Sequence, residues 1–391
     1  MIYLDNSATT SCFDEAVDIM TEALKDNFGN PSSLHNMGTK GKDYLKIARK
    51  QIGATLGLKV KNPNDERKLE SSIVFVSGGT EGNNLAIKGV CERRQGRGKH
   101  IITTKIEHAS VLNTFKYLEN HGFDVTYLGT DNYGVISLDE LKSAIREDTI
   151  LVSIMMVNNE IGSIQPISEA GKLIKSINEN TVFHVDAVQA YGKMPINPVE
   201  MNIDLLTVSG HKIHGPKGSG FVYMRDNLLV APQIIGGGHE NGMRSGTENV
   251  PAIAGLGVAA KLCFENLEAN IKHMYELRNR FINGIKDIEH VSINGHLDEA
   301  NAPHIVSVSI DGNRTKAQVI LNALQSKDIY VSAGSACSSN KPGISETLKA
   351  IGLDKKLLEK TIRFSFCPEN TFEEIDAAVA ALKEIVPLMV L

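Results

Sequence analysis

The sequence predicts an α/β protein built on a mostly parallel, seven-stranded sheet, with a smaller α+β domain beside it. Short, nearly continuous apolar runs alternate with helical patterns from about residue 73 to residue 224. Parallel strands that are buried on both faces have this composition. The chain has 391 residues, which is too long for one ordinary hydrophobic core and favours two domains.

Seven apolar or β-branched runs are predicted as the strands of the large sheet. They lie at residues 73–76, 100–103, 125–128, 150–157, 182–185, 205–208 and 220–224. Residues 61–70 are rich in charged and polar side chains and are predicted as a surface connection before the first strand.

A long helical pattern from about residue 250 to residue 285 is predicted as the hinge between the domains. The remainder of the chain is predicted to combine strands and helices. Strands are predicted near residues 304–310 and 361–366, and helices near residues 317–324 and 372–385.

Composition excludes several classes of protein. The net charge is -5 and no Lys/Arg run forms a basic stripe, which argues against nucleic-acid binding. No stretch of eighteen apolar residues indicates a membrane span, and the N-terminus does not resemble a signal peptide. The five cysteines are far apart without a CxxC pair, so neither a disulfide framework nor a zinc site is expected. A reducing cytoplasm is the simplest interpretation of these cysteines.

Two side chains at successive strand ends suggest a cofactor site. Lys212 follows the strand at 205–208, where its amine could form a Schiff base with an aldehyde cofactor. Asp186 follows the strand at 182–185, where a carboxylate could pair with a protonated pyridine nitrogen. A solvated surface lysine and a helix N-cap are the respective alternatives. The shared sheet edge favours the cofactor interpretation.

A glycine turn and a histidine add two weaker signals. Residues 77–84 pass from a strand through Gly78 and Gly79 into a helix, where free amides and the helix dipole suit a phosphate. Such a turn is also common in ordinary loops. His108 follows the strand at 100–103 and could stack on a ring or move a proton, although a purely structural role is the alternative.

Two further residues suggest a nucleophile and an anion site. Cys337 lies among small and polar residues at 332–340, a composition that predicts a mobile loop with an exposed thiol. An incidental surface thiol is the alternative. Arg363 lies within an apolar strand and should meet an anion. That anion could be a substrate carboxylate or the acid of an internal salt bridge.

With these motifs, the chain resembles the cysteine desulfurases, which are pyridoxal-phosphate enzymes of the class V aminotransferase group, and the likeness runs nearly end to end. The segments that carry it are residues 3–10, 28–33, 157–162, 209–212, 243–247 and 334–337. The resemblance implies the fold-type I architecture of pyridoxal-phosphate enzymes. It places the large cofactor-binding domain at residues 15–257, and the small domain at residues 1–14 and 258–391.

The resemblance also implies residue roles. Lys212 looks like the Schiff-base lysine, Asp186 the partner of the pyridine nitrogen and Gln189 that of the ring hydroxyl. His108 would stack on the ring and assist proton transfer. Cys337 would accept the sulfur as a persulfide, and transient ligation of an iron–sulfur cluster by this thiol stays open.

The remaining roles implied by the resemblance concern the phosphate and the substrate. Asn159 and Arg363 would hold the substrate carboxylate, and Asn159 would also contact the cofactor. The phosphate side of the cofactor site would comprise Gly79, Thr80, Ser209, Gly210, His211 and, from the other subunit of a homodimer, Thr247.

The function that the resemblance implies is removal of sulfur from L-cysteine, with L-alanine as product. The sulfur would pass to an iron–sulfur scaffold or another acceptor protein. Two departures from that branch are Ala333, where a second serine is usual, and an end soon after the helix near 372–385, which leaves the acceptor open. The alternatives are a selenocysteine lyase, a class V aminotransferase, or a non-catalytic sulfur-carrying scaffold.

Overall fold

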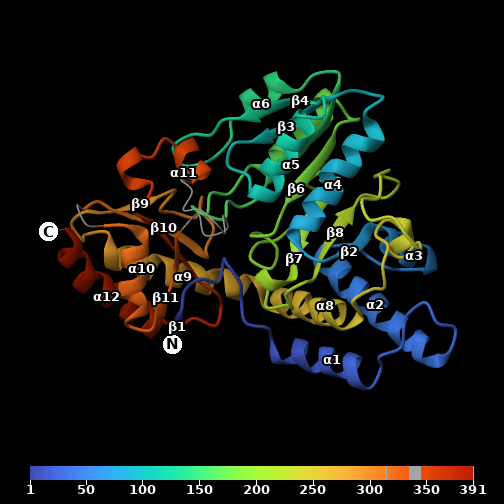
Figure 1. The fold of residues 1–391 in the computed structure, drawn as a ribbon, viewed down its shortest axis with the longest axis horizontal. Helices are drawn as coiled ribbons and strands as arrows, with labels where there is room; N and C mark the ends of the chain where they lie inside the picture. Colours follow the sequence, from blue (N-terminus) through green and yellow to red (C-terminus); the bar gives the residue numbers. More distant parts are fainter. Residues whose placement is uncertain (313–314, 334–344, 391) are drawn as a thin grey trace.

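The computed structural model describes residues 1–312, 315–333 and 345–390. The described part contains a seven-stranded sheet and a separate four-stranded sheet, each covered by helices (Figure 1). Helices α8 (Val250–Glu265) and α9 (Leu267–Ile285) run between the two units along one side of the molecule (Figure 1).

The large sheet confirms the predicted α/β class, and each of the seven predicted strands is present. The strand order is β2-β8-β7-β6-β5-β3-β4, and every pairing is parallel except those of β8, which is antiparallel to both neighbours. The bounds are β2 (Ile73–Val76), β3 (His100–Thr104), β4 (Asp124–Leu128), β5 (Thr149–Met155), β6 (Val182–Asp186), β7 (Leu205–Ser209) and β8 (Gly220–Met224).

The two faces of this sheet bury alternate residues in different cores. Ile73 and Phe75 of β2 belong to the core under α2, α7 and α8, whereas Val74 and Val76 belong to the core under α4 and α5. Side chains alternate across a strand, so a strand that is covered on both faces must be apolar throughout. This requirement produced the continuous apolar runs in the sequence.

The helices around the large sheet begin with α1 at the N-terminal side. Their bounds are α1 (Asp14–Lys25), α2 (Asn36–Thr55), α3 (Pro63–Ser72), α4 (Gly79–Arg94), α5 (Ala109–Glu119), α6 (Leu138–Ala144) and α7 (Ile167–Ile177). Helix α3 corrects the prediction of a surface connection at residues 61–70. Asn62 caps this helix and Pro63 occupies its first turn. The carboxylates of Asp65 and Glu66 also lie in the first turn, where they interact favourably with the positive end of the helix dipole.

The predicted hinge pattern is helical, but it is divided into two helices. Asn266 separates α8 from α9, and the two axes meet at a bend of 74°. No single helix among the described residues is long and apolar enough to span a membrane. Together α8 and α9 reach such a length and composition, but only as this bent pair.

The smaller unit joins the N-terminus to the C-terminal third of the chain. Its antiparallel sheet has the order β12-β13-β10-β9, and β1 pairs with β11 beside it. Leu4 shares its core with residues of α9, α10 and α12. The division at residues 14 and 257 stays a prediction. The bounds are β1 (Ile2–Tyr3), β9 (Val291–Asn294), β10 (Ile305–Ile310), β11 (Ile329–Tyr330), β12 (Ser332–Ala333), β13 (Thr361–Ser365), α10 (Ala317–Gln325), α11 (Glu346–Ala350) and α12 (Phe372–Val390).

A close contact between α4 and the sheet should be sensitive to one methyl group. A Cβ at Gly82 would lie 2.6 Å from Thr207 Cγ2 of β7 and 3.1 Å from Val222 Cγ2 of β8. We expect Gly82→Ala to lower the free energy of unfolding by about 1–3 kcal/mol, although alanine normally favours a helix. Urea denaturation measures this change.

Gly96→Ala is the matched control, because a Cβ there would meet no atom within 4 Å. If both variants unfold at the same urea concentration as the parent, α4 does not depend on this close approach to β7.

Candidate active site

A cleft lies at the carboxyl ends of three central strands of the large sheet. Met155, Asp186 and Ser209 end β5, β6 and β7 and line it. The cavity within it has a volume of about 200 Å³. The other residues that line it are Ser7, Ala8, Gly79, Thr80, Asn83, His108, Ser110, Val157, Asn159, Val188, Gln189, His211, Lys212 and Arg363.

Lys212 is buried at the base of this cleft. It ends the short 3₁₀ turn Gly210–Lys212 that follows β7, and its exposed fraction is 9%. Nζ donates hydrogen bonds to the carbonyl of Ser7 at 2.5 Å and to that of Ala8 at 2.8 Å. The alternative of a solvated surface lysine is therefore wrong. A buried amine with two carbonyl acceptors is oriented toward the cleft rather than toward bulk water.

Asp186 lies one strand away from Lys212, and both of its oxygens accept hydrogen bonds. Val188 N donates to Oδ1 at 3.0 Å, and Asn83 Nδ2 donates to Oδ2 at 2.7 Å. The first bond closes a turn directly after β6, and the alternative of a helix N-cap is wrong, because no helix lies in the described stretch between β6 and β7. The second bond comes from Asn83 of α4, and it fixes the carboxylate at the cleft.

Asn83 continues the hydrogen-bond chain to His108. Asn83 Nδ2 also donates to Ser110 Oγ at 2.8 Å, and Ser110 Oγ lies 2.9 Å from His108 Nδ1. Ser110 N donates to the same Nδ1 at 3.2 Å. Because Nδ1 accepts, the neutral imidazole carries its proton on Nε2. Sequence reasoning missed Asn83 and Ser110, since Asn83 meets Ser110 and Asp186 from 27 and 103 residues away in the chain.

Glu107, beside His108, is buried and structural in its contacts. Its Oε1 accepts from Thr104 Oγ1 and from Met155 N, both at 2.8 Å. Burial, opposed by the Met155 amide bond, raises the pKa of Glu107 to about 8. This carboxyl group is therefore mostly protonated at neutral pH and joins the ends of β3 and β5.

The predicted phosphate side is assembled at the start of α4. A Cβ at Gly79 would lie 2.8 Å from Val188 Cγ2, so this glycine allows the helix to start close to β6. Ser209 lies beside this glycine, and it lines the cleft together with His211. Burial, with a smaller contribution from Lys212, lowers the pKa of His211 to about 4, so its ring is neutral. Helix amides and neutral donors together suit a phosphate.

Arg363 lies in the cleft and already has an acidic partner. Its Nη2 donates to Asp5 Oδ1 at 2.9 Å, and its Nη1 donates to the Asn159 carbonyl at 2.7 Å. The internal salt bridge that was left open in the sequence is therefore present. Burial raises the pKa of Asp5, and Arg363 opposes that rise.

Two predicted residues do not line the cleft, and a third is outside the described residues. Thr247 lines a different hollow, beside Glu240 and Arg244. Gly210 packs against the chain rather than lining the cleft, because a Cβ would lie 2.4 Å from Ser219 Oγ. Cys337 lies outside the described residues.

The residues that flank the Cys337 segment lie beside the cleft. Ser332 is paired with Arg363 across β12 and β13. Ser345 Oγ donates to Glu160 Oε2 at 2.5 Å, and Glu160 directly follows Asn159. The chain therefore leaves and re-enters the described structure next to two lining residues.

Comparisons with known proteins agree along nearly the whole chain. The profile of the family described as aminotransferase class-V matches residues 2–378. A cysteine desulfurase IscS of Methanosarcina thermophila is 43% identical over 388 residues, covering 98% of this chain and 92% of that protein. A cysteine desulfurase IscS of Salmonella schwarzengrund (strain CVM19633) is 44% identical over the same coverage.

Solved structures give the same result. A NifS-like protein superposes with a TM-score of 0.90 at 37% identity, covering 99% of each chain. A NifS-like protein from Rickettsia africae ESF-5 gives a TM-score of 0.85 at 32% identity, covering 98% of this chain and 99% of that one. The structure of SspA in complex with cysteine gives a TM-score of 0.80 at 35% identity, covering 95% of this chain and 100% of that one.

The amide of Asn83 should contribute measurably to stability. Asn83→Ala removes the donor from Asp186 Oδ2 inside the protein, and an oxygen left without its donor there costs about 1–3 kcal/mol. We expect a loss of that size in the free energy of unfolding, measured by urea denaturation.

Asn84→Ala provides the comparison from the neighbouring position, where the amide bonds only the Thr80 carbonyl of its own helix. Equal effects of the two substitutions would contradict the role assigned to Asn83.

Proposed function

The chain belongs to the aminotransferase class-V family and, within it, to the cysteine desulfurases, and from this premise we propose how its own residues perform the reaction. The substrate is L-cysteine, the products are L-alanine and a persulfide on Cys337, and the cofactor is pyridoxal phosphate. The convergence of Lys212 and Asp186 in one buried cleft carries this assignment.

The residues of the cleft fit pyridoxal phosphate. Within the described part of the chain, Gln189 Oε1 is buried without a hydrogen-bond partner, as a partner for a ring hydroxyl would be. Lys212 would bind the aldehyde carbon, Asp186 the ring nitrogen, and His108 the ring face. When bound, the cofactor supplies an electron sink for charge that develops on the substrate α-carbon.

The phosphate would lie against the start of α4. Gly79 and Thr80 offer the helix amides, and Ser209 and His211 complete the cradle from the end of β7. Lys217 borders the same hollow and adds a positive charge. A helix N-terminus with a nearby cation is a favourable site for a phosphate group.

Proton transfers are assigned to two atoms. Lys212 Nζ takes the α-proton of the substrate, and the carbonyls of Ser7 and Ala8 hold that nitrogen in place. His108 donates from Nε2, because its Nδ1 accepts from Ser110. This tautomer favours an acid role for neutral His108, in place of the basic assistance to the Cys337 thiol that we expect from the sequence.

Sulfur transfer requires a nucleophile and a held substrate. Arg363 and Asn159 bind the substrate carboxylate. The Cys337 thiolate attacks the substrate sulfur, so an S–S bond forms as the Cβ–S bond breaks. Cβ gains one proton, and Lys212 Nζ returns a proton to Cα, which completes alanine. Ser332 and Ser345, which flank the segment outside the described residues, are paired with Arg363 and bonded to Glu160, and both contacts support this assignment.

Assembly is proposed on the same basis. A homodimer would bring Thr247 of one subunit to the phosphate of the other, which is consistent with its distance from the cleft of its own chain. The sulfur would pass to an iron–sulfur scaffold or another acceptor protein in the cytoplasm, with transient cluster ligation by Cys337 as a further possibility. The curated relatives named IscS favour a desulfurase over a selenocysteine lyase or an aminotransferase.

Removal of the amine tests the cofactor assignment. Lys212→Ala should abolish turnover and the visible absorbance of the purified protein, because Lys212 is the only lysine among the described residues that line the cleft. Absorbance spectra and borohydride trapping followed by peptide mass spectrometry measure this. Lys193→Ala is not a suitable control, because Lys193 Nζ donates to the Lys212 carbonyl. Lys175, whose amine pairs with Asp204 behind the sheet, offers Lys175→Met as the control.

The sulfur acceptor requires a separate experiment. After incubation with cysteine, the peptide that contains Cys337 should gain the mass of one sulfur atom, with alanine formed in equal amount in the first turnover. Cys337→Ser should keep the visible absorbance and lose alanine formation. Cys91→Ser, at a buried cysteine of α4, should keep both the absorbance and alanine formation. Full alanine production by Cys337→Ser would remove the thiol from the reaction.

Arg363 should act on substrate affinity more than on the chemical step. Arg363→Lys keeps the charge but loses the paired donors to Asp5 and Asn159. We expect kcat/KM for cysteine to fall by more than about tenfold, mostly through KM, since a charge-assisted hydrogen bond contributes about 1.5–3 kcal/mol. Steady-state alanine formation measures both constants, and a change confined to kcat would contradict the assignment.

A further inference from the structure

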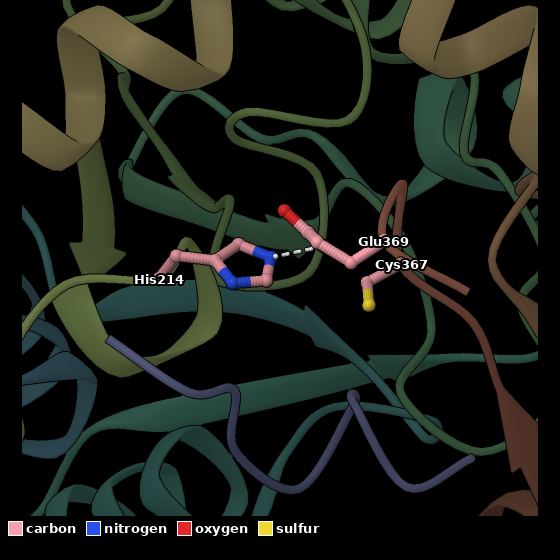
Figure 2. A group of neighbouring side chains, drawn as sticks. All are labelled: His214, Cys367 and Glu369. Carbon is pink, nitrogen blue, oxygen red and sulfur yellow. Dashed lines mark ion pairs between the residues drawn. The ribbon is translucent and has the colours of Figure 1, made fainter. Parts of the chain in front are cut away.

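A second cluster of ligand-type side chains lies outside the cleft, behind the Lys212 turn. His214, Cys367 and Glu369 offer a ring nitrogen, a thiol and a carboxylate whose ligand atoms all lie within 4.8 Å of one another. Figure 2 shows the imidazole of His214 directed at the carboxylate of Glu369, with the Cys367 thiol beside it. The proposed desulfurase reaction uses none of these three side chains.

The cluster is held by contacts that orient its histidine. His214 is buried and stacks on Phe13 with ring centroids 4.5 Å apart. Its Nδ1 lies 3.1 Å from the carbonyl of Ser11. A carbonyl oxygen can only accept, so Nδ1 carries a proton and Nε2 of the neutral ring presents a lone pair. A bond from the second ring nitrogen to a backbone carbonyl is the usual support for a metal-binding histidine.

The lone pair of Nε2 faces another acceptor. Glu369 Oε2 lies 3.4 Å away, and two acceptors at this separation need a proton or a cation between them. In a tetrahedral zinc site, bond lengths near 2.0 Å to nitrogen and oxygen place those two atoms about 3.3 Å apart. The sulfur would lie about 3.5 Å from each by the same geometry, which is inside the observed limit of 4.8 Å.

We propose that His214, Cys367 and Glu369 form a binding site for Zn²⁺. One nitrogen, one thiolate and one carboxylate form a ligand set that suits zinc, and three protein ligands leave the fourth position to water. The side chain of Glu369 is half exposed, so an ion can enter from solvent, while the other two ligands are buried.

The site would join the two units of the fold next to the reaction centre. His214 is two residues after Lys212, whereas Cys367 and Glu369 follow β13, the strand that carries Arg363. A bound ion would therefore fix the turn of the amine relative to the strand of the proposed substrate arginine. The expected consequence is a higher unfolding temperature of the metal-loaded protein.

Neighbouring charges set the conditions for binding. The Cys367 thiol donates to Asn370 Oδ1 at 3.5 Å and must lose that proton to the solvent when it binds zinc. Buried Lys193 interacts electrostatically with His214, Cys367 and Cys263. A positive charge on this amine opposes a cation bound at the cluster.

The test uses the holoenzyme with Cys337→Ser, which removes the reaction thiol as a competing ligand. Titration calorimetry with Zn²⁺ should show one equivalent per chain, and Co²⁺ should give the intense visible d–d absorption of a tetrahedral site with a thiolate ligand. Cys367→Ala and His214→Asn should each weaken zinc affinity by more than about 100-fold, since even the partners of metal ligands contribute 10–100-fold. Asparagine tolerates the positive φ of 59° at position 214.

Cys91→Ala is the matched control, because Cys91 is also a buried thiol but lies in α4. Glu369→Gln, at a half-exposed position, covers the case in which the buried variants fail to fold. The proposal is overturned if the parent binds no more zinc than a variant that combines Cys367→Ala, His214→Asn and Glu369→Gln. It is also overturned if Glu369→Gln and Cys367→Ala each bind zinc as tightly as the parent does. It is also overturned if zinc leaves the unfolding temperature unchanged, which would identify the His214–Glu369 contact as an ordinary ion pair.

Discussion

The buried amine of Lys212 constrains the arrangement of the whole cleft. A charged nitrogen with 9% exposure needs acceptors, and the carbonyls of Ser7 and Ala8 provide them. The N-terminal segment must therefore cross the carboxyl ends of β6 and β7. The same segment accepts from Gln189 through the Ser7 carbonyl and is bonded by Asn6 to Ser365. The N-terminal segment that compensates the burial of Lys212 thus connects the large sheet to the sheet of the smaller unit.

The sequence predicted the large sheet well because burial on both faces leaves a signal in each strand by itself. Helix α3 was missed because its surface is polar and only the cap at Asn62 and Pro63 marks its start. The division of the hinge pattern at Asn266 was missed because both sides have helical periodicity. Where a signal depends on packing between distant segments, a single sequence does not contain it.

The site shows the same division between local and distant information. Asp186 and Lys212 could be predicted because each directly follows a strand, and parallel strand ends share one edge. Asn83 could not, because it meets Asp186 from a position 103 residues earlier in the chain. Asp5, the partner of Arg363, is 358 residues away from it. Strand ends therefore indicate where a site lies, while tertiary pairing decides the partners that hold its charges.

Those pairings also determine where charge can change during substrate binding. Near pH 7, His211 is neutral because its pKa is about 4, and Glu107 is mostly protonated because its pKa is about 8. Neither side chain therefore adds charge to the cleft. Asp5 differs, because burial raises its pKa while Arg363 opposes the rise. A substrate carboxylate that takes over donors of Arg363 would weaken that opposition, and the pKa of Asp5 would rise further. Binding of the anion and the pKa of Asp5 are therefore coupled through one guanidinium.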